Sequence, residues 1–439
     1  MSTPSPFLEP EIETASRATL TGIQDTRLRE QVTHAWTSSP FYRHKLTAAG
    51  VTPEQVRTLA DLPRLPFTTK DELKQDQADH PLWGTLLAVP FEDCLRVHMT
   101  SATTGRPLAF LDTRDDWHGF YHCYARSLHA FGVRRSDVVM AAFSYGPWIG
   151  YWSGFYAAQD LGALVFPAGG LSTDQRIDAL RTYPITVLGC TPSYALFLAE
   201  QAAKKGIDLA RETKIRLTWH TGEPGASIPA TKARIEAAFG ARAFDLPGLT
   251  EIAAWGFECE ASGLTHVHED YCYPEVLDEA DRPVRPGERG ELVFTSLYRK
   301  AMPLLRYRTR DIVQLADRPC PCGRTLVAFE GGVLARVDDM KKIRGIIVYP
   351  RRIEEIVRAH AGVDEFQIVF RRVAGLDEIC VRVDPAPAAD RDRLRDAVAH
   401  DLHVGLGIRA GVEVTEPGAL PRFDHKARRV VDERTEVPF

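Results

Sequence analysis

The segment Thr100–Leu108, which reads T-S-A-T-T-G-R-P-L, gathers the side chains best suited to holding an anion. Hydroxyl groups, one glycine and the cation of Arg106 stand together where a turn would expose backbone N–H groups, and such a turn forms a concavity that wraps phosphate oxygens. The Walker A spacing G-x-x-x-x-G-K-[ST] is absent, so the segment does not imply a P-loop fold. Clusters of Ser, Thr and Gly are also typical of solvated loops, and other parts of the sequence must decide between the two readings.

The composition of the 439 residues excludes several classes of protein. With 44% hydrophobic and 26% charged residues the chain is an ordinary globular protein, and its net charge of −5 gives no basic surface for nucleic acid or an anionic membrane. The acidic N-terminus lacks the apolar core of a signal peptide, and no apolar run reaches the length of a membrane span. Eight scattered cysteines argue against a disulfide framework. We therefore expect a cytoplasmic protein that acts on small molecules, without nucleic-acid or membrane partners.

The hydrophobic pattern predicts an α/β fold. Prolines interrupt the helical patterns of residues 1–100, where Leu28–Leu46 is an amphipathic stretch. Short apolar runs then alternate with helical patterns, which indicates mostly parallel sheets with covering helices, and turn signals between Tyr271 and Leu315 indicate a more twisted β subdomain. The predicted strands are Val138–Phe143, Leu164–Phe166, Thr186–Leu188 and Ile215–His220, and the predicted helices are Ile149–Leu161, Thr191–Lys204 and Ile228–Phe239.

The end of the chain reads as a separate small α+β domain. A helix, two strands, a charged helix and a last strand follow one another at Arg351–Ala361, Glu365–Arg371, Glu378–Val383, Ala388–Leu402 and before Leu420. The predicted domains are therefore a large N-terminal domain at residues 1–337 and a small, mobile C-terminal domain at residues 338–439.

Several segments downstream of Thr100–Leu108 combine carboxylates, cations and glycines in a fixed order. They are T-G-E-P at Thr221–Pro224, D-L-P-G-L-T-E at Asp245–Glu251, Y-R-T-R-D at Tyr307–Asp311, A-R-V-D-D-M-K-K-I-R-G at Ala335–Gly345 and P-R-F-D-H-K at Pro421–Lys426. In this order the chain resembles the acyl-adenylate-forming enzymes, most closely the phenylacetate–CoA ligase family, from about residue 30 to residue 434. The runs G-E-R-G-E-L-V-F-T-S-L and M-P-L-L-R-Y-R-T-R-D support the resemblance. It implies an AMP-forming acid–thiol ligase that uses ATP, Mg²⁺ and coenzyme A.

The chemistry of adenylation explains these residue types. A carboxylate attacks the α-phosphate of ATP and expels pyrophosphate, so the protein works by positioning and by stabilising charge. The resemblance implies that Thr250 and Glu251 lie at the α-phosphate, with Glu251 a ligand of Mg²⁺, and that Lys426 bridges the carboxylate and the α-phosphate. Asp338 matches the hinge of the small domain. The implied nucleotide-binding residues are Ser101, Thr103, Thr104, Gly105, Arg106, Gly222, Glu223, Pro224, Asp245, Asp311 and Arg336.

The acid pocket of the family corresponds here to the aromatic-rich run Phe143–Tyr156. Rings with interleaved glycines suit a flat ring bound between aromatic walls, although they also suit ordinary core packing. Tyr145, Trp148 and Gly248 are the expected pocket residues. His220 either hydrogen-bonds a ring substituent or is a structural histidine with satisfied partners. On the first reading the substrate is a hydroxy- or amino-substituted aryl acid.

A structural zinc site is a further expectation from the resemblance. C-P-C-G supplies Cys320 and Cys322, and C-E-A-S-G-L-T-H supplies Cys259 and His266, with His268 as a rival for the imidazole. Three thiolates and one imidazole form a closed tetrahedral zinc site. The alternative is a set of thiols without metal.

The sequence departs from the family pattern at several motif positions. Pro247 replaces an aromatic residue, Ala102 a glycine, Arg106 a lysine, and Ala335 and His425 glycines. Arg and Lys bind phosphate differently, so a divergent member is expected. Alternatives to coenzyme A as acceptor of the acyl group are a carrier-protein thiol, an amine, or nitrite as in an ATP-dependent diazotase. A further alternative is transfer of AMP itself to a cofactor, as in coenzyme F390 synthetase-like relatives. A nucleotide-binding regulator without turnover is disfavoured by Glu251 and Lys426. The resemblance also implies a homodimer.

Overall fold

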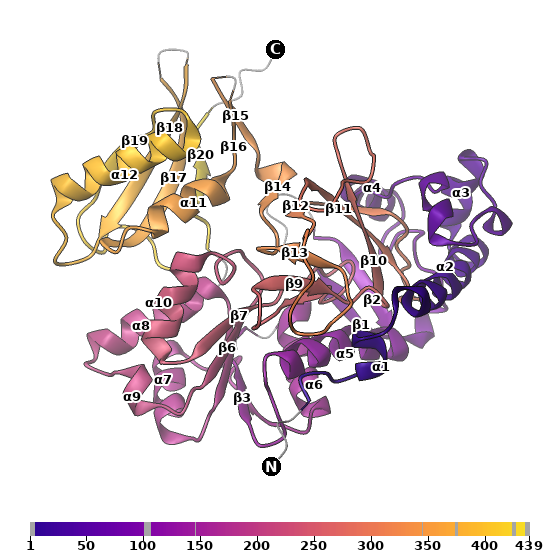
Figure 1. Cartoon of the computed structure of the whole chain (residues 1–439), viewed down its shortest axis with the longest axis horizontal. Coiled ribbons are helices and arrows are strands. Elements are labelled where there is room, and N and C mark those ends of the chain that lie inside the picture. Colours follow the sequence, from indigo (N-terminus) through magenta and orange to yellow (C-terminus); the bar gives the residue numbers. More distant parts are fainter. Residues whose placement is uncertain are drawn as a thin grey trace.

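The computed structural model describes residues 5–100, 107–144, 146–344, 346–373, 376–423 and 427–434. A parallel five-stranded sheet with the strand order β4-β3-β5-β6-β7 lies in the large domain (Figure 1). This is the order of a doubly wound sheet, in which strands are added first to one side of β3 and then, from β5 onward, to the other side. Ligands bind such sheets beyond the carboxyl ends of the strands, at the point where the order reverses. The strands are β3 (Val138–Ala141), β4 (Leu164–Pro167), β5 (Val187–Cys190), β6 (Leu217–His220) and β7 (Arg242–Asp245).

Hydrophobic cores cover both faces of this sheet. Alternate residues of β3 point to opposite faces, so Val139 packs with Trp219 and helix α5 while Met140 packs with Leu198 of α8 and Ile235 of α10. Burial on both faces explains why the strands read as continuous apolar runs in the sequence. The helices are α5 (Arg114–Ala130), α6 (Ile149–Asp160), α7 (Thr173–Thr182), α8 (Pro192–Lys204), α9 (Leu209–Glu212) and α10 (Pro229–Phe239).

Antiparallel sheets form the β region of the large domain, and they extend beyond the span expected from turn signals. The sheets are the hairpin β1-β2, the four-stranded β10-β11-β12-β14 and the three-stranded β13-β9-β8. Their strands are β1 (Cys94–Met99), β2 (Ala109–Thr113), β8 (Gly256–Glu258), β9 (Leu264–Val267), β10 (Cys272–Leu277), β11 (Arg289–Ser296), β12 (Tyr307–Gln314), β13 (Ala328–Glu330) and β14 (Ala335–Arg336).

The amphipathic stretch Leu28–Leu46 is divided between two helices. The side chain of Ser39 accepts a hydrogen bond from the backbone N–H of Tyr42 and caps a new helix, in which Pro40 takes the first position. Near the N-terminus the helices are α1 (Pro10–Glu13), α2 (Arg17–Ser38), α3 (Pro40–Ala48) and α4 (Lys70–Asp79), with 3₁₀ turns η1 (Pro53–Gln55), η2 (Leu59–Arg64) and η3 (Phe91–Asp93). None of the helices in the described part of the chain has the length and apolar character needed to cross a membrane.

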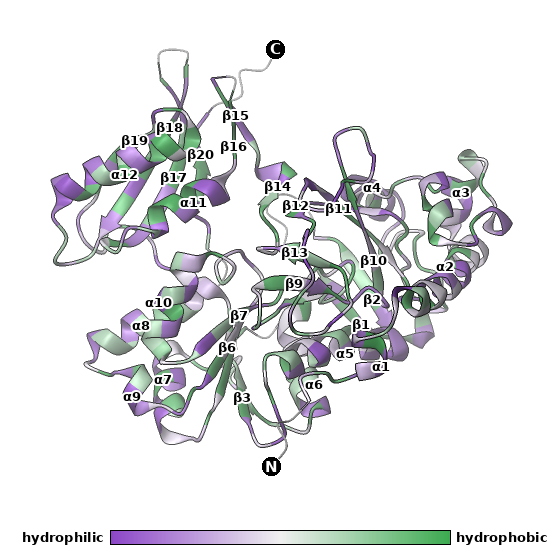
Figure 2. Cartoon of the chain, viewed as in Figure 1, coloured by the Kyte–Doolittle hydropathy of each residue, from purple (hydrophilic) through white to green (hydrophobic). Residues whose placement is uncertain are grey.

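The C-terminal segment forms its own sheet and core, drawn in orange and yellow in Figure 1. Ile353 and Val357 of α11 pack against Phe366 of β17 and Val398 of α12, and Figure 2 shows this hydrophobic character along β17 and α11. The sheet has the order β19-β18-β17-β20. The elements are η4 (Val337–Asp339), β15 (Lys341–Ile343), β16 (Ile346–Val348), α11 (Pro350–Arg358), β17 (Val363–Val373), β18 (Leu376–Pro385), α12 (Arg391–Leu406), β19 (Gly411–Val414) and β20 (Val430–Asp432).

Candidate functional site

Several predicted site residues lie outside the described residues, and the structure instead shows what flanks them. The flanks of the phosphate segment are joined at the neck of the β1–β2 hairpin, where the backbone N–H of Thr100 donates to the carbonyl of Leu108 at 2.9 Å. The hydroxyl of Thr100 in turn accepts from the N–H of Leu108 at 3.1 Å. The predicted residues outside the described part are Ser101, Thr103, Thr104, Gly105, Arg106, Tyr145 and Lys426.

The predicted adenine segment follows β6, while Asp245 is the last residue of the neighbouring β7 and Gly248 follows that strand. Gly222 has φ +93°, a backbone conformation that side chains with a Cβ rarely adopt. The carboxylate of Glu223 accepts the N–H of Ser193 at 2.9 Å and the N–H of Ala427 at 2.8 Å. These residues therefore meet at the carboxyl edge of the parallel sheet, where the small domain contacts the large one.

The carboxylate of Glu251 is 4% exposed and has two partners that the sequence did not reveal. Its Oε1 accepts from the hydroxyl of Tyr307 at 3.1 Å and from Nζ of Lys70 at 3.2 Å. Burial, and then the charge of Glu251, raise the pKa of Tyr307, which stays a neutral donor. The backbone of Thr250 and Glu251 is held by Arg299, whose Nη1 donates to both carbonyls at 2.9 and 2.8 Å.

Asp311, Arg336 and Asp338 form one ionic group at the domain boundary. Asp311 and Arg336 are cross-strand partners on β12 and β14, and Nη1 of Arg336 lies 2.9 Å from Oδ1 of Asp311. Asp338 in η4 lies 3.6 Å from Arg336 and accepts from Nε of Arg310 at 3.2 Å. A small cleft beside this group is lined by Pro224, Arg336, Tyr349 and Arg351 among others. The predicted ribose-side and hinge residues are thus neighbours.

The predicted acid-pocket residues have different surroundings. Trp148 is 43% exposed and directly precedes α6, on the chain that follows β3. His220 is fully buried, and its ring nitrogens lie 3.1 Å from the carbonyl of Cys190 and 2.9 Å from the hydroxyl of Thr218. Burial lowers the pKa of His220 to about 4, so the ring is neutral at neutral pH. This geometry favours the structural alternative for His220 over a contact with a ring substituent.

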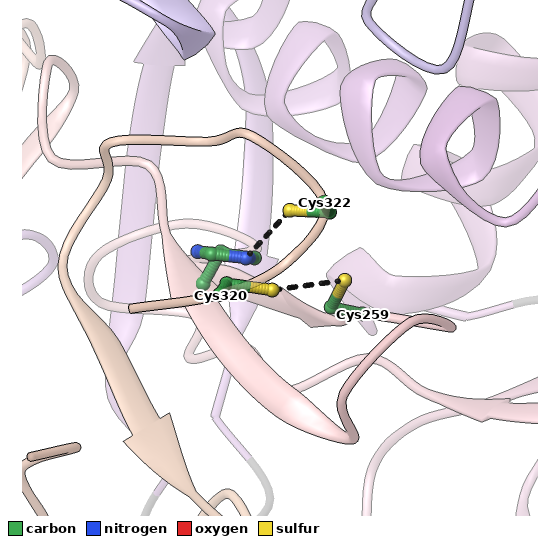
Figure 3. A group of neighbouring side chains, drawn as sticks. Cys259, Cys320 and Cys322 are labelled. Atoms are coloured by element: carbon green, nitrogen blue, oxygen red, sulfur yellow. Dashed lines mark hydrogen bonds between the residues drawn. The ribbon is translucent and has the colours of Figure 1, made fainter. Parts of the chain in front are cut away.

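The four predicted zinc ligands converge (Figure 3). The ligand atoms of Cys259, His266, Cys320 and Cys322 all lie within 4.8 Å of one another. Antiparallel pairing of β9 with β13 brings them together, because it places Ala328 opposite His266 and so carries the Cys320–Cys322 loop to the Cys259 turn. The hydrogen bond between Cys259 and Cys322 lowers the pKa of Cys322 and raises that of Cys259, so the two thiols share one proton in the metal-free site.

His268, the rival imidazole, lies outside this group. Its Nε2 is 3.0 Å from the hydroxyl of Ser127 and its Nδ1 is 3.4 Å from Arg126, both on α5. His266, by contrast, places Nε2 3.4 Å from the sulfur of Cys322, and its Nδ1 is buried with no hydrogen-bond partner among the described residues.

Comparison with known proteins shows relatives over nearly the whole chain. The profile of the AMP-binding enzyme family matches residues 16–298, and that of the AMP-binding enzyme C-terminal domain matches residues 345–434. The chain is 36% identical to a phenylacetate–coenzyme A ligase of Thermus thermophilus, over 97% of this chain and 99% of the relative. It is 34% identical to a phenylacetate–coenzyme A ligase of Escherichia coli, over 97% and 98% of the two chains.

Solved structures of 2-hydroxyisobutyryl-CoA ligase share the fold. The complex with 2-HIB-AMP in the postadenylation state superimposes with a TM-score of 0.92 at 33% identity, covering 99% of this chain and 94% of that one. The same ligase in the thioesterification state, with CoA, gives a TM-score of 0.75 over the same shares of the chains. The chain therefore belongs to the phenylacetate–CoA ligase family of acyl-adenylate-forming enzymes and is an AMP-forming acid–CoA ligase that works through an acyl-AMP.

Proposed function

We propose that the enzyme activates an aryl carboxylic acid as its acyl-AMP and transfers the acyl group to coenzyme A. The observation that carries the proposal is that the Gly222–Pro224 and Asp245–Glu251 segments lie at the carboxyl ends of neighbouring parallel strands, and that Pro224 lines one cleft with Arg336, the partner of Asp311. The curated relatives named as phenylacetate–coenzyme A ligases and the aromatic run around Trp148 support an aryl acid.

In this proposal Glu251 would be a ligand of Mg²⁺ at the α-phosphate, and Asp311 would accept hydrogen bonds from both ribose hydroxyls. A buried carboxylate that faces phosphate oxygens suits a hard cation. Thr250 lies at the α-phosphate, and Gly222, Glu223, Pro224, Asp245 and Arg336 surround the nucleotide. Lys426 supplies the cation for the reacting carboxylate, and Asp338 is the hinge about which the small domain rotates.

We further propose that Cys259, His266, Cys320 and Cys322 hold a structural zinc ion. A donor set of three sulfurs and one imidazole nitrogen matches a closed tetrahedral site. Because the cysteines of the described chain are all free thiols, a reducing compartment such as the cytoplasm suits this site. The homodimer that the resemblance implies is part of the proposal, and light scattering on the purified protein tests it.

The ring substituent is the finer part of the proposal. Hydroxy- and amino-substituted aryl acids are retained as substrates, but their recognition would need a group other than His220, whose nitrogens already have partners. The test is a panel of hydroxy-, amino- and unsubstituted aryl acids with phenylacetate and 2-hydroxyisobutyrate, incubated with ATP and Mg²⁺ with and without coenzyme A. An aryl-CoA that requires coenzyme A supports the proposal, and acid-dependent pyrophosphate release without thioester points to another acceptor. Preference for 2-hydroxyisobutyrate contradicts the aryl acid.

A further inference from the structure

We propose that Arg299 is a positioning residue for adenylation, which fixes the Thr250–Glu251 backbone against the β1–β2 hairpin. Arg299 follows β11 and is fully buried. A buried guanidinium group needs hydrogen-bond acceptors and an opposite charge around it. The residues that supply them are the parts of the chain that Arg299 holds together. The proposal rests on the proposed function, because it takes Glu251 as the Mg²⁺ ligand.

On one side Arg299 holds the turn that carries Glu251. Its Nη1 donates to the carbonyls of Thr250 and Glu251 at 2.9 and 2.8 Å. The neighbouring Tyr298 donates its hydroxyl to the carbonyl of Ile252 at 3.0 Å. Two adjacent side chains thus bind the three successive carbonyls of this turn, which has no helix or long strand of its own to satisfy them.

On its other side Arg299 is paired with the hairpin. Its Nη2 lies 2.6 Å from Oδ1 of Asp112 on β2, and its guanidinium lies 5.0 Å from the ring centre of Phe110. Oδ2 of Asp112 accepts from Nδ1 of His98 on β1 at 2.8 Å. Asp112 and His98 are themselves buried, at 0% and 1% exposed. The chain of contacts therefore joins both strands of the hairpin to the Glu251 turn.

These contacts fix the position of the Glu251 carboxylate relative to the β1–β2 hairpin. Tyr307 and Lys70 orient the carboxylate itself, and Arg299 ties the backbone of Glu251 directly to Asp112 on β2. Displacement of a positioned group by about 1 Å can cost roughly 10²-fold in rate. Loss of the guanidinium should therefore weaken adenylation, which needs Mg²⁺ and the polyphosphate, more than thioester formation, which needs neither.

The experiment compares Arg299→Met and Arg299→Lys with wild type and with the exposed control Arg285→Met. For each protein, acid-dependent ATP–pyrophosphate exchange is measured across a Mg²⁺ titration, and thioester formation is measured from supplied acyl-AMP and coenzyme A. We expect R299M to lose roughly 10²-fold in exchange and to need more Mg²⁺, while its thioester step stays within about threefold of wild type. R299K, which keeps a charged donor for the carbonyls and Asp112, should recover at least about tenfold.

Equal losses in both half-reactions, or unchanged exchange in R299M, would overturn the proposal. If R299M does not fold, Asp112→Asn takes its place, because it keeps the shape of the contact but removes the charge that holds Arg299. The same selective loss of exchange is expected there, and an unselective loss counts against the proposal. Wild-type protein that shows no acid-dependent exchange would instead contradict the proposed function, so the two failures are distinguishable.

Discussion

The carboxylate of Glu223 joins Ala427, 204 residues later in the chain, to the large domain. Its Oε2 accepts the N–H of Ala427 at 2.8 Å, and its Oε1 accepts the N–H of Ser193 at 2.9 Å. Arg429 adds a second link, since its Nη2 donates to the hydroxyl of Ser193 at 3.0 Å. Ala427 directly follows Lys426 in the sequence, so Glu223 anchors the segment next to the proposed adenylation lysine. This domain arrangement resembles the postadenylation state of 2-hydroxyisobutyryl-CoA ligase more than its thioesterification state.

The first prediction is that Glu223→Gln slows adenylation selectively. The two N–H groups bind different oxygens of Glu223, and Gln replaces one of these oxygens with an NH₂ donor, so one of the two bonds is lost. A hydrogen bond to a charged group contributes about 1.5–3 kcal/mol. We expect a fall of roughly tenfold or more in ATP–pyrophosphate exchange, and little change in thioester formation from supplied acyl-AMP. The exposed Glu279→Gln is the control. Equal effects on the two half-reactions would show that Glu223 only supports the fold.

The second prediction concerns Lys426→Ala. The lysine is proposed to stabilise charge that develops between the carboxylate and the α-phosphate, so its loss should reduce acyl-AMP formation by on the order of 10²–10³-fold. Thioester formation from supplied acyl-AMP should largely survive. The two half-reactions are measured separately by mass spectrometry of acyl-AMP and acyl-CoA, and a parallel loss of both would refute the assigned role.

The sequence predicted the elements whose patterns are local. Short apolar runs between helical patterns predicted the strands β3, β4, β5 and β6 of the parallel sheet but not β7, and Ile353, Ile356 and Val357 marked the buried face of α11. The hairpin strand β1 was not predicted, because residues 1–100 read as helices interrupted by prolines and the exposed–buried alternation of Cys94–Met99 is short. The break between α2 and α3 was also not predicted, because only one capping serine, Ser39, and one proline, Pro40, mark it in the sequence.

The site was predictable only where a motif carries it. Glu251 and Asp311 stand in recognisable runs, but their partners do not: Lys70 is 181 residues away from Glu251, and Arg299 lies 48 residues beyond it. Contacts between residues so far apart in the sequence depend on how the hairpin, the sheet and the turn pack together. A local sequence pattern carries no information about that packing. The His266 assignment came from the resemblance, whereas the β9–β13 pairing supplies its physical reason.

The third prediction is that purified protein carries about one equivalent of zinc that stabilises it. Cys322→Ser should lose the metal and lower the Tm, whereas Cys94→Ser, a half-buried cysteine outside the group, should change neither. A chelator should lower the Tm of wild type but not of the Cys322 variant. Less than about 0.1 equivalent of zinc in metal analysis of carefully prepared protein would contradict the site.

The fourth prediction follows from the buried carboxyl of Asp245. Burial, and then the charge of Glu258, raise the pKa of Asp245 from 3.8 to about 7. A raised pKa favours the protonated form in the folded state, so the contribution of Asp245 to stability should fall as the pH rises from about 4 to about 7 and then level off. Asp245→Asn removes this dependence. Above neutral pH the free energy of unfolding of the variant should exceed that of the wild type by roughly 4 kcal/mol. The Tm values of the wild type and of Asp245→Asn are compared at pH 4.5 and at pH 8, with the exposed Asp392→Asn as control. A Tm difference between variant and wild type that is the same at both pH values would contradict the prediction.

The fifth prediction separates the two roles considered for His220. Because its nitrogens are bonded to Cys190 and Thr218 inside the large domain, His220→Gln should destabilise the fold by about 1–3 kcal/mol. The ratio of kcat/KM for a hydroxybenzoate to that for benzoate should change by less than about threefold, since no bond to the substituent is lost. Thr218→Val, which removes one ring partner without touching the carboxyl edge of the sheet, should likewise lower the Tm and leave the ratio unchanged. A selective loss of about tenfold or more for the hydroxy acid in the His220 variant alone would show instead that the ring contacts the substituent, at the expense of the Thr218 or Cys190 bond.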